Sequence, residues 1–180
     1  LSYQVSREDA VRSAGRVLKE TGAAAVKLEG GSEEIADAVR HMVGIGIPVL
    51  GHLGFTPQSV HVLGGSRVQG RGEEGRARLL EEALRLEAAG AFAIVLELVP
   101  GELAAEVTRE LRIPTVGIGA GAACDGQVLV LHDMLGLNSV FEPRFLRRFA
   151  ELGRDAAAGV GEYVRAVREG EYPAPEHTFE

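Results

Sequence analysis

The chain has 180 residues, and its hydrophobic content of 46% is enough for a packed core in one domain spanning 1–180. With a formal net charge of −7 and no basic run longer than Arg147-Arg148, the sequence lacks the basic patch of a nucleic-acid-binding protein. No stretch approaches the roughly 18 apolar residues of a membrane span. We therefore expect small molecules and other protein subunits as partners, with no nucleic acid and no membrane.

Cysteine usage and the first residues indicate where the protein works. Cys124 is the only cysteine, which excludes an intrachain disulfide framework and a cysteine-based zinc site. The N-terminal residues have neither the basic region nor the apolar region of a signal peptide. These features favour a reducing, cytoplasmic location.

Helical and strand-like patterns alternate along the chain, and glycines or capping residues separate them. The short apolar runs are typical of buried parallel strands. In chain order we expect a helix between Ser6 and Gly22, a strand over 23–28, a helix between Ser32 and Gly44, a strand over 48–53, a glycine-rich connection over 54–72, a helix over 73–89, a strand over 92–98, a helix near 103–111, a strand over 114–118, a strand over 128–131 and a closing helix over 143–167.

This alternation predicts a parallel sheet, either doubly wound or closed into a barrel. One connection is unusual, because residues 119–127 leave little room for a helix, whereas parallel crossovers usually need a dozen or more residues. We therefore expect the last strand or its connection to be irregular. The closing helix is expected to point its apolar side chains inward, namely Phe145, Phe149, Leu152, Val160 and Val164.

Polar residues end three of the expected strands: Lys27 and Glu29 on the first, His52 on the second and Glu97 on the third. Because strand side chains alternate, Lys27 and Glu29 point to the same face. In a parallel barrel the catalytic groups lie at such carboxyl ends of strands. The alternative for Lys27 and Glu29 is a buried ion pair or a frayed strand end, since charged residues are rarely buried unless paired.

Glu97 and His52 each have two interpretations. The neighbours of Glu97 in sequence are apolar, which disfavours its charged form and makes it a candidate general base. The alternative is a bond from Glu97 to a neighbouring loop. His52 is equally consistent with a substrate contact and with a core histidine bonded to backbone. After the last strand, His132 and Asp133 are possible ligands, although a helix start explains Asp133 equally well.

Two glycine-rich segments suggest loops with a role. The run Gly117-Ile118-Gly119-Ala120-Gly121-Ala122 fits a dinucleotide fingerprint after a strand, but no helix is expected directly after it. We expect a close backbone approach or an anion contact there, or simple glycine packing. The 54–72 segment is long enough to act as a lid. Its Arg67 and Arg71 either meet an anionic cofactor or are solvated surface charges.

Several motifs in this order resemble the ketopantoate hydroxymethyltransferase family across the whole chain. The matching runs are Lys27-Leu28-Glu29-Gly30-Gly31, Gly51-His52-Leu53-Gly54-Phe55-Thr56-Pro57-Gln58-Ser59, Gly64-Gly65, Val68-Gln69-Gly70-Arg71, Ile94-Val95-Leu96-Glu97, Val99-Pro100, Ile113 to Gly121, Cys124-Asp125-Gly126-Gln127, His132-Asp133, Tyr172-Pro173 and Glu176-His177-Thr178-Phe179.

The resemblance implies a (β/α)8 TIM barrel, of which about five strands are represented here. It also implies a Mg²⁺-dependent transfer of a hydroxymethyl group from 5,10-methylenetetrahydrofolate to 3-methyl-2-oxobutanoate, giving ketopantoate in pantothenate biosynthesis. By the same resemblance, Lys27 binds substrate, Glu29 is a magnesium carboxylate and Glu97 is the base. His52 is placed with Lys27 as a substrate contact. The resemblance further suggests a homo-oligomer, a decamer in the family.

The family has roughly three further strands before the segment that starts here, and they carry two aspartate magnesium ligands and part of the 2-oxo acid site. A barrel of this kind typically needs about 250 residues. We expect the sequence to be the ordered portion of a longer chain, because a five-stranded remnant would expose a sheet edge. The alternatives are a magnesium-dependent lyase or mutase of the phosphoenolpyruvate/pyruvate barrel type, and an inactive barrel remnant with an assembly role.

Overall fold

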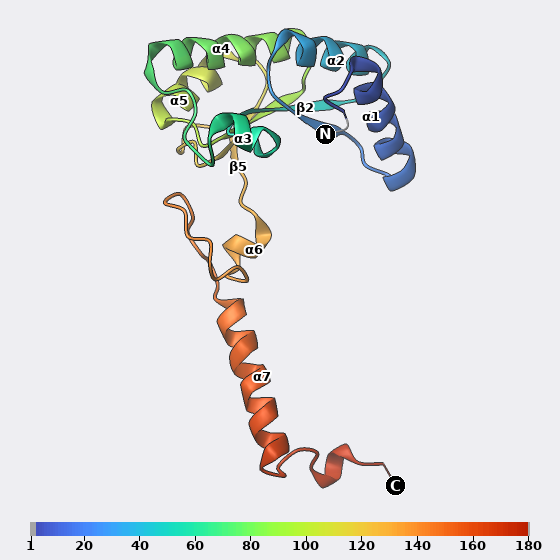
Figure 1. The fold of residues 1–180 in the computed structure, drawn as a ribbon, viewed down its shortest axis with the longest axis vertical. Helices are drawn as coiled ribbons and strands as arrows, with labels where there is room; N and C mark the ends of the chain where they lie inside the picture. The colour runs from blue at the N-terminus through green and yellow to red at the C-terminus, as the bar shows by residue number, and fades with distance from the viewer. Residues whose placement is uncertain (1–2, 180) are drawn as a thin grey trace. The chain divides into compact units, whose positions relative to one another are not determined.

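The structure is a computed structural model that describes residues 3–179 (Figure 1). The chain divides after Val128 into two compact units, and each is described by itself. The single domain expected over 1–180 stays a prediction. Within residues 3–179, no helix combines the length and the apolar character needed to cross a bilayer.

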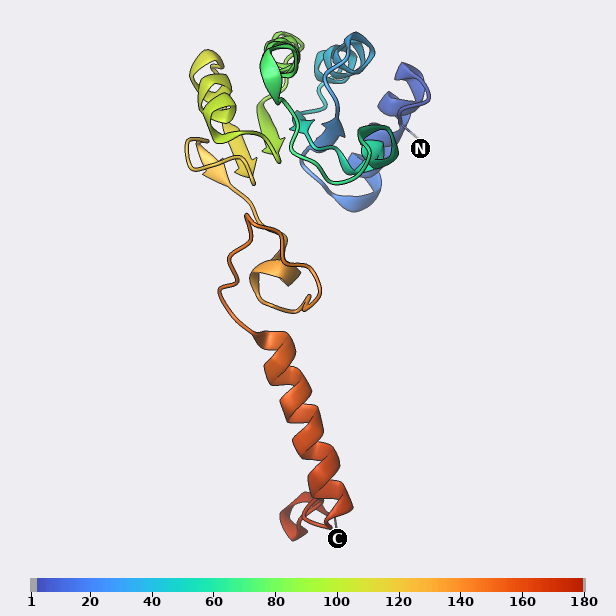
Figure 2. The ribbon, with the colours of Figure 1, turned by 60° about the vertical axis from the view of Figure 1, so that its left-hand side comes forward.

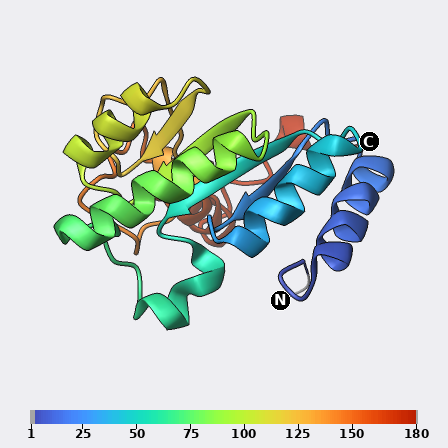
Figure 3. The same cartoon turned by 90° about the horizontal axis from the view of Figure 1, so that it is seen from above.

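The first unit is a five-stranded parallel sheet with its long helices on one side. In Figure 2 these helices lie in a row along one face of the sheet, and Figure 3 shows the strands running beneath them. The strands are β1 (Val26–Glu29), β2 (Val49–Gly54), β3 (Ala93–Glu97), β4 (Thr115–Ile118) and β5 (Gly126–Gln127). The long helices are α1 (Arg7–Thr21), α2 (Glu33–Gly44), α4 (Gly72–Ala88) and α5 (Gly101–Glu110). A short 3-10 turn, η1 (Pro57–Ser59), and a short helix, α3 (Val60–Leu63), lie between β2 and α4 in the chain.

The order of the strands distinguishes the two fold classes left open by the sequence. All neighbouring strands are parallel, and their order in the sheet is β1-β2-β3-β4-β5. A doubly wound sheet reverses its strand order at a switch point and carries helices on both faces. Consecutive order with helices on one face is the arrangement of strands in a (β/α)8 barrel, here as an open sheet. The predicted alternation and the five parallel strands are confirmed.

The core lies between the sheet and its helices. Because side chains alternate along a strand, every second residue faces the helix layer, and Val49, Leu53, Ile94 and Leu96 are almost completely buried there. They pack in one core with apolar side chains of the helices, including Val39, Met42, Leu86, Leu103 and Val107. The residues between them point to the opposite face, which none of the four long helices covers in the described part of this unit (Figure 2).

The predicted helix signals act as expected. The Ser6 side chain accepts a hydrogen bond from the Asp9 backbone amide at 3.1 Å, and Gly22 ends α1 in the left-handed region. The Ser32 hydroxyl likewise accepts from the Ile35 amide at 3.4 Å and begins α2. The connection before β5 contains no helix, so the predicted irregularity of this crossover is confirmed.

The last predicted strand and helix have different bounds in the structure. The strand lies at Gly126–Gln127 and not at 128–131, because the Val130 carbonyl accepts from Asp133 and Met134 and starts helix α6 (Leu131–Met134). The closing helix α7 is Leu152–Arg168 and not 143–167. Phe149 and Leu152 donate their amides to the backbone of residues 134 and 135, so the chain becomes helical only after this contact.

Four of the five predicted inward side chains of the closing helix are wrong for the described residues, and the fifth, Phe145, is half-buried but lies before α7. Phe149, Leu152, Val160 and Val164 are all exposed, and no residue of α7 is buried. The periodicity of apolar residues identified an amphipathic helix correctly, but it did not identify what would cover the apolar face. A short turn, η2 (Pro175–His177), follows α7.

Gly54 sets the contact between β2 and β3 at the carboxyl edge of the sheet. Its φ is +90°, and a Cβ atom built on it would lie 2.1 Å from the Glu97 carbonyl oxygen. The next amide, from Phe55, donates to that same carbonyl at 2.8 Å. No side chain fits between these backbones, so glycine is required for both reasons.

We predict that Gly54→Ala destabilises the protein by more than ~2 kcal/mol, because the methyl group forces the strand ends apart and strains φ. Urea unfolding measures the difference. Gly15→Ala is the matched control, since Gly15 lies within α1 with nothing near its Cβ position. The control should gain up to about 1 kcal/mol of helix stability. Equal stability of wild type and Gly54→Ala would contradict this close approach.

Candidate active site

The strand register places three of the four predicted site residues together. Glu29 pairs with His52 across β1 and β2, and Gly54 pairs with Glu97 across β2 and β3. Paired residues of parallel strands point to the same face, so Glu29, His52 and Glu97 all lie on the face opposite the helices. Lys27, two residues before Glu29, shares this face. The predicted clustering at the carboxyl ends of the strands follows directly from this register.

The His52 ring lies between the two carboxylates. Its Nδ1 is 3.9 Å from Glu29 Oε1, and its Nε2 is 3.1 Å from Glu97 Oε2. A protonated ring presents an N–H to each side, whereas a neutral ring presents only one. The His52 side chain thus joins the ends of β1, β2 and β3.

His52 is buried without a hydrogen-bond partner among residues 3–179. Its exposed fraction is 1%, and the contact with Glu97 is close but does not have hydrogen-bond geometry. The alternative of a core histidine bonded to backbone is therefore wrong. Buried polar groups in proteins are nearly always satisfied, so an unsatisfied imidazole at a strand end indicates a place for a ligand.

Glu29 is held from two further directions. Its Oε2 accepts a hydrogen bond from the backbone amide of Gln58 at 3.0 Å, and the backbone amide of Glu29 donates to the Tyr3 hydroxyl at 3.3 Å. Burial raises the pKa of Tyr3 above its usual range. Tyr3 and Gln58 are not among the predicted site residues. Nothing in the local sequence of Tyr3 indicates the contact, because its partner lies 26 residues away.

Glu97 and Lys27 are more accessible than His52. The Glu97 side chain is 20% exposed, and Lys27 is exposed on the same face. The structure forms no ion pair between Lys27 and Glu29, so the predicted alternative of a buried pair is wrong. Leu98, directly after Glu97, has a φ of +49°, an uncommon conformation for a non-glycine residue. Its backbone amide and carbonyl are both hydrogen-bonded, to Ile118 and Gln69, and these bonds hold the strained turn beside the carboxylate.

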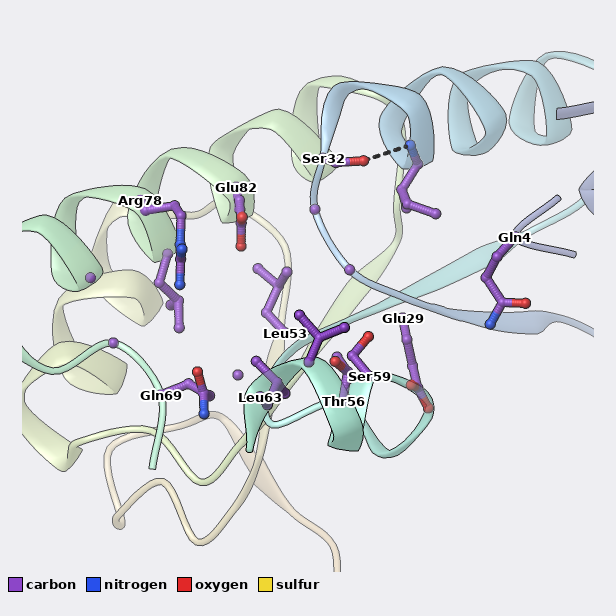
Figure 4. A pocket seen from close by; sticks show the side chains of 18 residues that line it. Gln4, Glu29, Ser32, Leu53, Thr56, Ser59, Leu63, Gln69, Arg78 and Glu82 are labelled. Carbon is purple, nitrogen blue, oxygen red and sulfur yellow. Dashed lines mark hydrogen bonds between the residues drawn. The ribbon is translucent and has the colours of Figure 1, made fainter. Parts of the chain in front are cut away.

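A cavity of about 360 Å³ adjoins this cluster, and Glu29 and Gly54 form part of its wall. It lies between α4 and the segment that follows β2, as Figure 4 shows. From α4, Arg78 and Glu82 point toward it. Burial raises the pKa of Glu82, with the nearby guanidinium groups of Arg78 and Arg85 acting in the opposite direction. Sequence reasoning missed Glu82, which has the periodicity of an ordinary helix-surface residue.

The other candidate groups have structural explanations. The 117–122 glycines lead into a turn and β5, which confirms the rejection of a dinucleotide fingerprint. Gly121 packs against the backbone of Gly101, with its Cβ position 3.1 Å from the Gly101 Cα atom. In the second unit, Asp133 is buried and accepts from the Asn138 side-chain amide at 3.0 Å. Arg67 and Arg71 are exposed, as solvated surface charges are.

The described residues offer an incomplete set of metal ligands. Residues 3–179 contain no group of three or more histidine, cysteine, aspartate or glutamate side chains placed to hold a metal ion. Glu29 and Glu97 nevertheless provide carboxylate oxygens, which are the ligands that Mg²⁺ prefers, and proteins often bind Mg²⁺ through only one or two carboxylates. The carboxylate of Glu29 therefore has the ligand chemistry that magnesium prefers.

The raised pKa of Glu82 predicts a pH-dependent stability. A carboxyl group whose pKa is raised by folding contributes stability below its unfolded value, which is near 4.5, and this contribution is lost as the pH rises through the folded value. We therefore expect Glu82→Gln to be more stable than wild type at about pH 7.5 and similar to it at about pH 4.

Urea unfolding at the two pH values measures this difference. Glu74→Gln is the control, since Glu74 is exposed on the same helix. A stability advantage of Glu82→Gln that does not change with pH would contradict the burial of the Glu82 carboxylate.

Known proteins with similar sequences carry the same enzyme name and match nearly the whole chain. The family model described as ketopantoate hydroxymethyltransferase matches residues 1–175. A 3-methyl-2-oxobutanoate hydroxymethyltransferase of Leptospira interrogans is 51% identical over 179 residues, which are 99% of this chain and 68% of that protein. The enzymes with the same name from Kosmotoga olearia and Frankia alni are 55% and 58% identical, with 67% and 58% of their lengths covered.

The chain thus spans about two thirds of the length of these relatives, or somewhat less. A solved structure described as a lyase/mutase from Burkholderia cenocepacia covers 93% of this chain and 58% of its own, at 17% identity and a TM-score of 0.44, which is too low to support an argument. The match of the family model and the identities of the relatives show that this chain belongs to the ketopantoate hydroxymethyltransferase family, a family of transferases.

Proposed function

We propose that the protein transfers a hydroxymethyl group from 5,10-methylenetetrahydrofolate to 3-methyl-2-oxobutanoate, giving ketopantoate. The names of the relatives support the acceptor and the transferred group. The observation that carries the proposal is the placement of Glu29, His52 and Glu97 on the uncovered face of the sheet, with His52 buried and unsatisfied between the carboxylates.

The reaction needs a base, because the carbon that accepts the hydroxymethyl group must first lose a proton. Glu97 is placed for this role: its carboxylate is partly exposed at the end of β3, and the His52 ring lies 3.1 Å from it. The C3 proton passes to Glu97, and the electron pair of the C–H bond forms the enolate. Lys27, exposed on the same face, supplies positive charge for the carboxylate of the substrate or for the enolate.

The transfer step balances with one water molecule. The enolate carbon bonds to the methylene carbon of the folate, and the two bonds from that carbon to the folate nitrogens break. Water provides the hydroxyl oxygen of the product. The two folate nitrogens gain one proton from C3 of the substrate, through Glu97, and one from the water. No oxidant or reductant is needed.

Magnesium fits this site through Glu29. A bound Mg²⁺ would polarise the ketone oxygen of the 2-oxo acid and so acidify the adjacent C–H bond. Glu29 is suited to hold it because the Gln58 amide fixes one carboxylate oxygen, Oε2, and leaves Oε1 facing His52. The family match disfavours the alternative of a lyase or mutase. The remaining alternative is an inactive remnant with an assembly role.

We also propose a cytoplasmic homo-oligomer. The single cysteine, Cys124, supports a reducing compartment. Helix α7 supports association, because it exposes Val160, Tyr163, Val164 and Val167 and buries none of its residues within the described chain. An apolar helix face of this kind normally packs against another surface. The decamer suggested by the family resemblance stays a prediction.

We predict that Glu97→Gln lowers the exchange of the C3 proton of 3-methyl-2-oxobutanoate with solvent by at least about 100-fold, because a general base contributes roughly 10²–10⁴ to such a step. Proton NMR in deuterated water follows the exchange without folate. Glu110→Gln, an exposed carboxylate on α5, should exchange like wild type. Exchange by Glu97→Gln at the wild-type rate would remove Glu97 from the base role.

We predict that Glu29→Ala raises the Mg²⁺ concentration needed for half-maximal activity by at least about 10-fold, the size of effect seen when groups supporting a metal site are lost. Glu29→Gln separates this effect from loss of the Gln58 contact, since its amide oxygen still accepts the Gln58 N–H. Both variants should show the shift. An unchanged magnesium requirement in Glu29→Gln would show that Glu29 is not a ligand.

A further inference from the structure

The cavity beside the catalytic cluster is lined by apolar and polar side chains. Leu53 of β2 and Leu63 of α3 line it, as Figure 4 shows, and Leu79 of α4 also forms part of its wall. Its volume of about 360 Å³ lies within the range of small-molecule sites, roughly 300–1,000 Å³. Apolar side chains together with polar groups in its lining suit a ligand with an apolar face and a hydrogen-bonding edge.

One carboxylate faces this cavity without a partner. Glu82 forms no hydrogen bond and no ion pair in the part of the chain that the structure describes, although it is only partly exposed. Its neighbour Arg85 is occupied elsewhere: its Nη1 donates to the Gly31 carbonyl at 2.7 Å, and its Nη2 pairs with Glu81 at 2.5 Å. The Glu82 carboxylate therefore has its acceptor oxygens available to a ligand.

The position of Glu82 is set by close packing. A Cβ atom on Gly31 would lie 2.5 Å from Glu82 Cβ, so the glycine allows the turn after β1 to contact α4. The bond from Arg85 to Gly31 fixes that contact. Because Gly31 follows Glu29 by two residues, the same turn connects Glu82 to the predicted magnesium carboxylate. The Cβ and Cγ atoms of Glu82 are therefore packed against the backbone of this turn.

The chemistry of the cavity identifies a class of ligand. A carboxylate accepts two parallel hydrogen bonds from neighbouring N–H groups that share one edge, as in a guanidine or amidine. A flat ring with such an edge is a 2-amino-4-oxopteridine, whose amino group and adjacent ring N–H form the edge. We propose that this cavity holds the pteridine ring of the one-carbon carrier, with Glu82 accepting from that edge; this inference rests on the proposed function.

The location also suits a carrier. The cavity shares Glu29 with the catalytic cluster, and Gly54, also in its wall, is paired with Glu97 in the sheet. A ring bound there lies next to the end of β3, where the enolate forms. The backbone amide of Gln69, another residue in the wall of the cavity, donates to the carbonyl of Leu98. This hydrogen bond connects the wall of the cavity to the strained turn after Glu97. The carrier in the cavity and the 2-oxo acid at the strand ends would thus bind at adjoining sites.

Steady-state kinetics of the purified protein test the inference with 5,10-methylenetetrahydrofolate as the varied substrate. Glu82→Gln should raise the KM for this carrier by about 10- to 100-fold, the effect of losing a charged acceptor in a partly buried pair. The KM for 3-methyl-2-oxobutanoate and the folate-independent exchange of its C3 proton should stay within about 2-fold of wild type. Glu74→Gln, on the exposed side of the same helix, should leave all three unchanged.

A second pair of measurements tests the assigned contact itself. Binding of 2-desamino-2-methyltetrahydrofolate, which lacks the amino donor, should be about 10-fold or more weaker than binding of tetrahydrofolate in wild type, and the two should bind alike in Glu82→Gln. Leu63→Trp, which fills the cavity, should also weaken tetrahydrofolate binding while C3 exchange continues. Equal carrier affinity in wild type and Glu82→Gln, with normal exchange, would overturn this inference alone. Absence of C3 exchange in wild type would instead overturn the proposed function.

Discussion

The register of three parallel strands is the constraint on which the rest of the site depends. Pairing Glu29 with His52, and Gly54 with Glu97, puts three titratable side chains on one face at the same edge of the sheet. A shift of one residue in either pairing would turn one of them into the helix-packed core. Gly54 holds this register, because only a glycine permits the Glu97 carbonyl to approach so closely.

The same alternation explains why the sheet can be stable and reactive at once. Its helix-covered face contains the most deeply buried apolar side chains of the strands, such as Leu53, Ile94 and Leu96, while the opposite face carries Lys27, Glu29, His52 and Glu97. The unsatisfied His52 costs stability, since a buried polar group without a partner is destabilising by roughly 1–3 kcal/mol. Such costs are typical of sites prepared for a ligand that supplies the missing contacts. The strained Leu98 beside Glu97 belongs to the same pattern.

Much of this could be predicted from the sequence, for reasons that differ from residue to residue. Apolar runs and glycine stops predicted the first four strands of the sheet close to their observed positions, because burial and backbone freedom are local properties. The charged strand ends led to the predictions for Lys27, Glu29 and Glu97, since a charge at the end of an apolar run is rare without a role. The family resemblance added their chemical roles, which periodicity alone does not provide.

Other features depend on contacts that no local pattern encodes. Tyr3 and Glu82 each reach the site from a distant segment, and their own sequence neighbourhoods are those of a loop and of an ordinary helix. The start of α7 was placed too early because residues 149–152 pair with the backbone of residues 134 and 135, a long-range contact. Its exposed apolar face was wrongly assigned to the core because periodicity shows that a face is apolar and not what packs against it.

The most direct test of the central claim is a crystal structure of the protein with 3-methyl-2-oxobutanoate and Mg²⁺. We predict the 2-oxo acid on the uncovered face of the sheet, with its C3 atom facing the Glu97 carboxylate and with Glu29 bound to the metal. We also predict that His52 gains a hydrogen bond in the complex. A 2-oxo acid bound away from these strand ends, with His52 still unsatisfied, would contradict the claim.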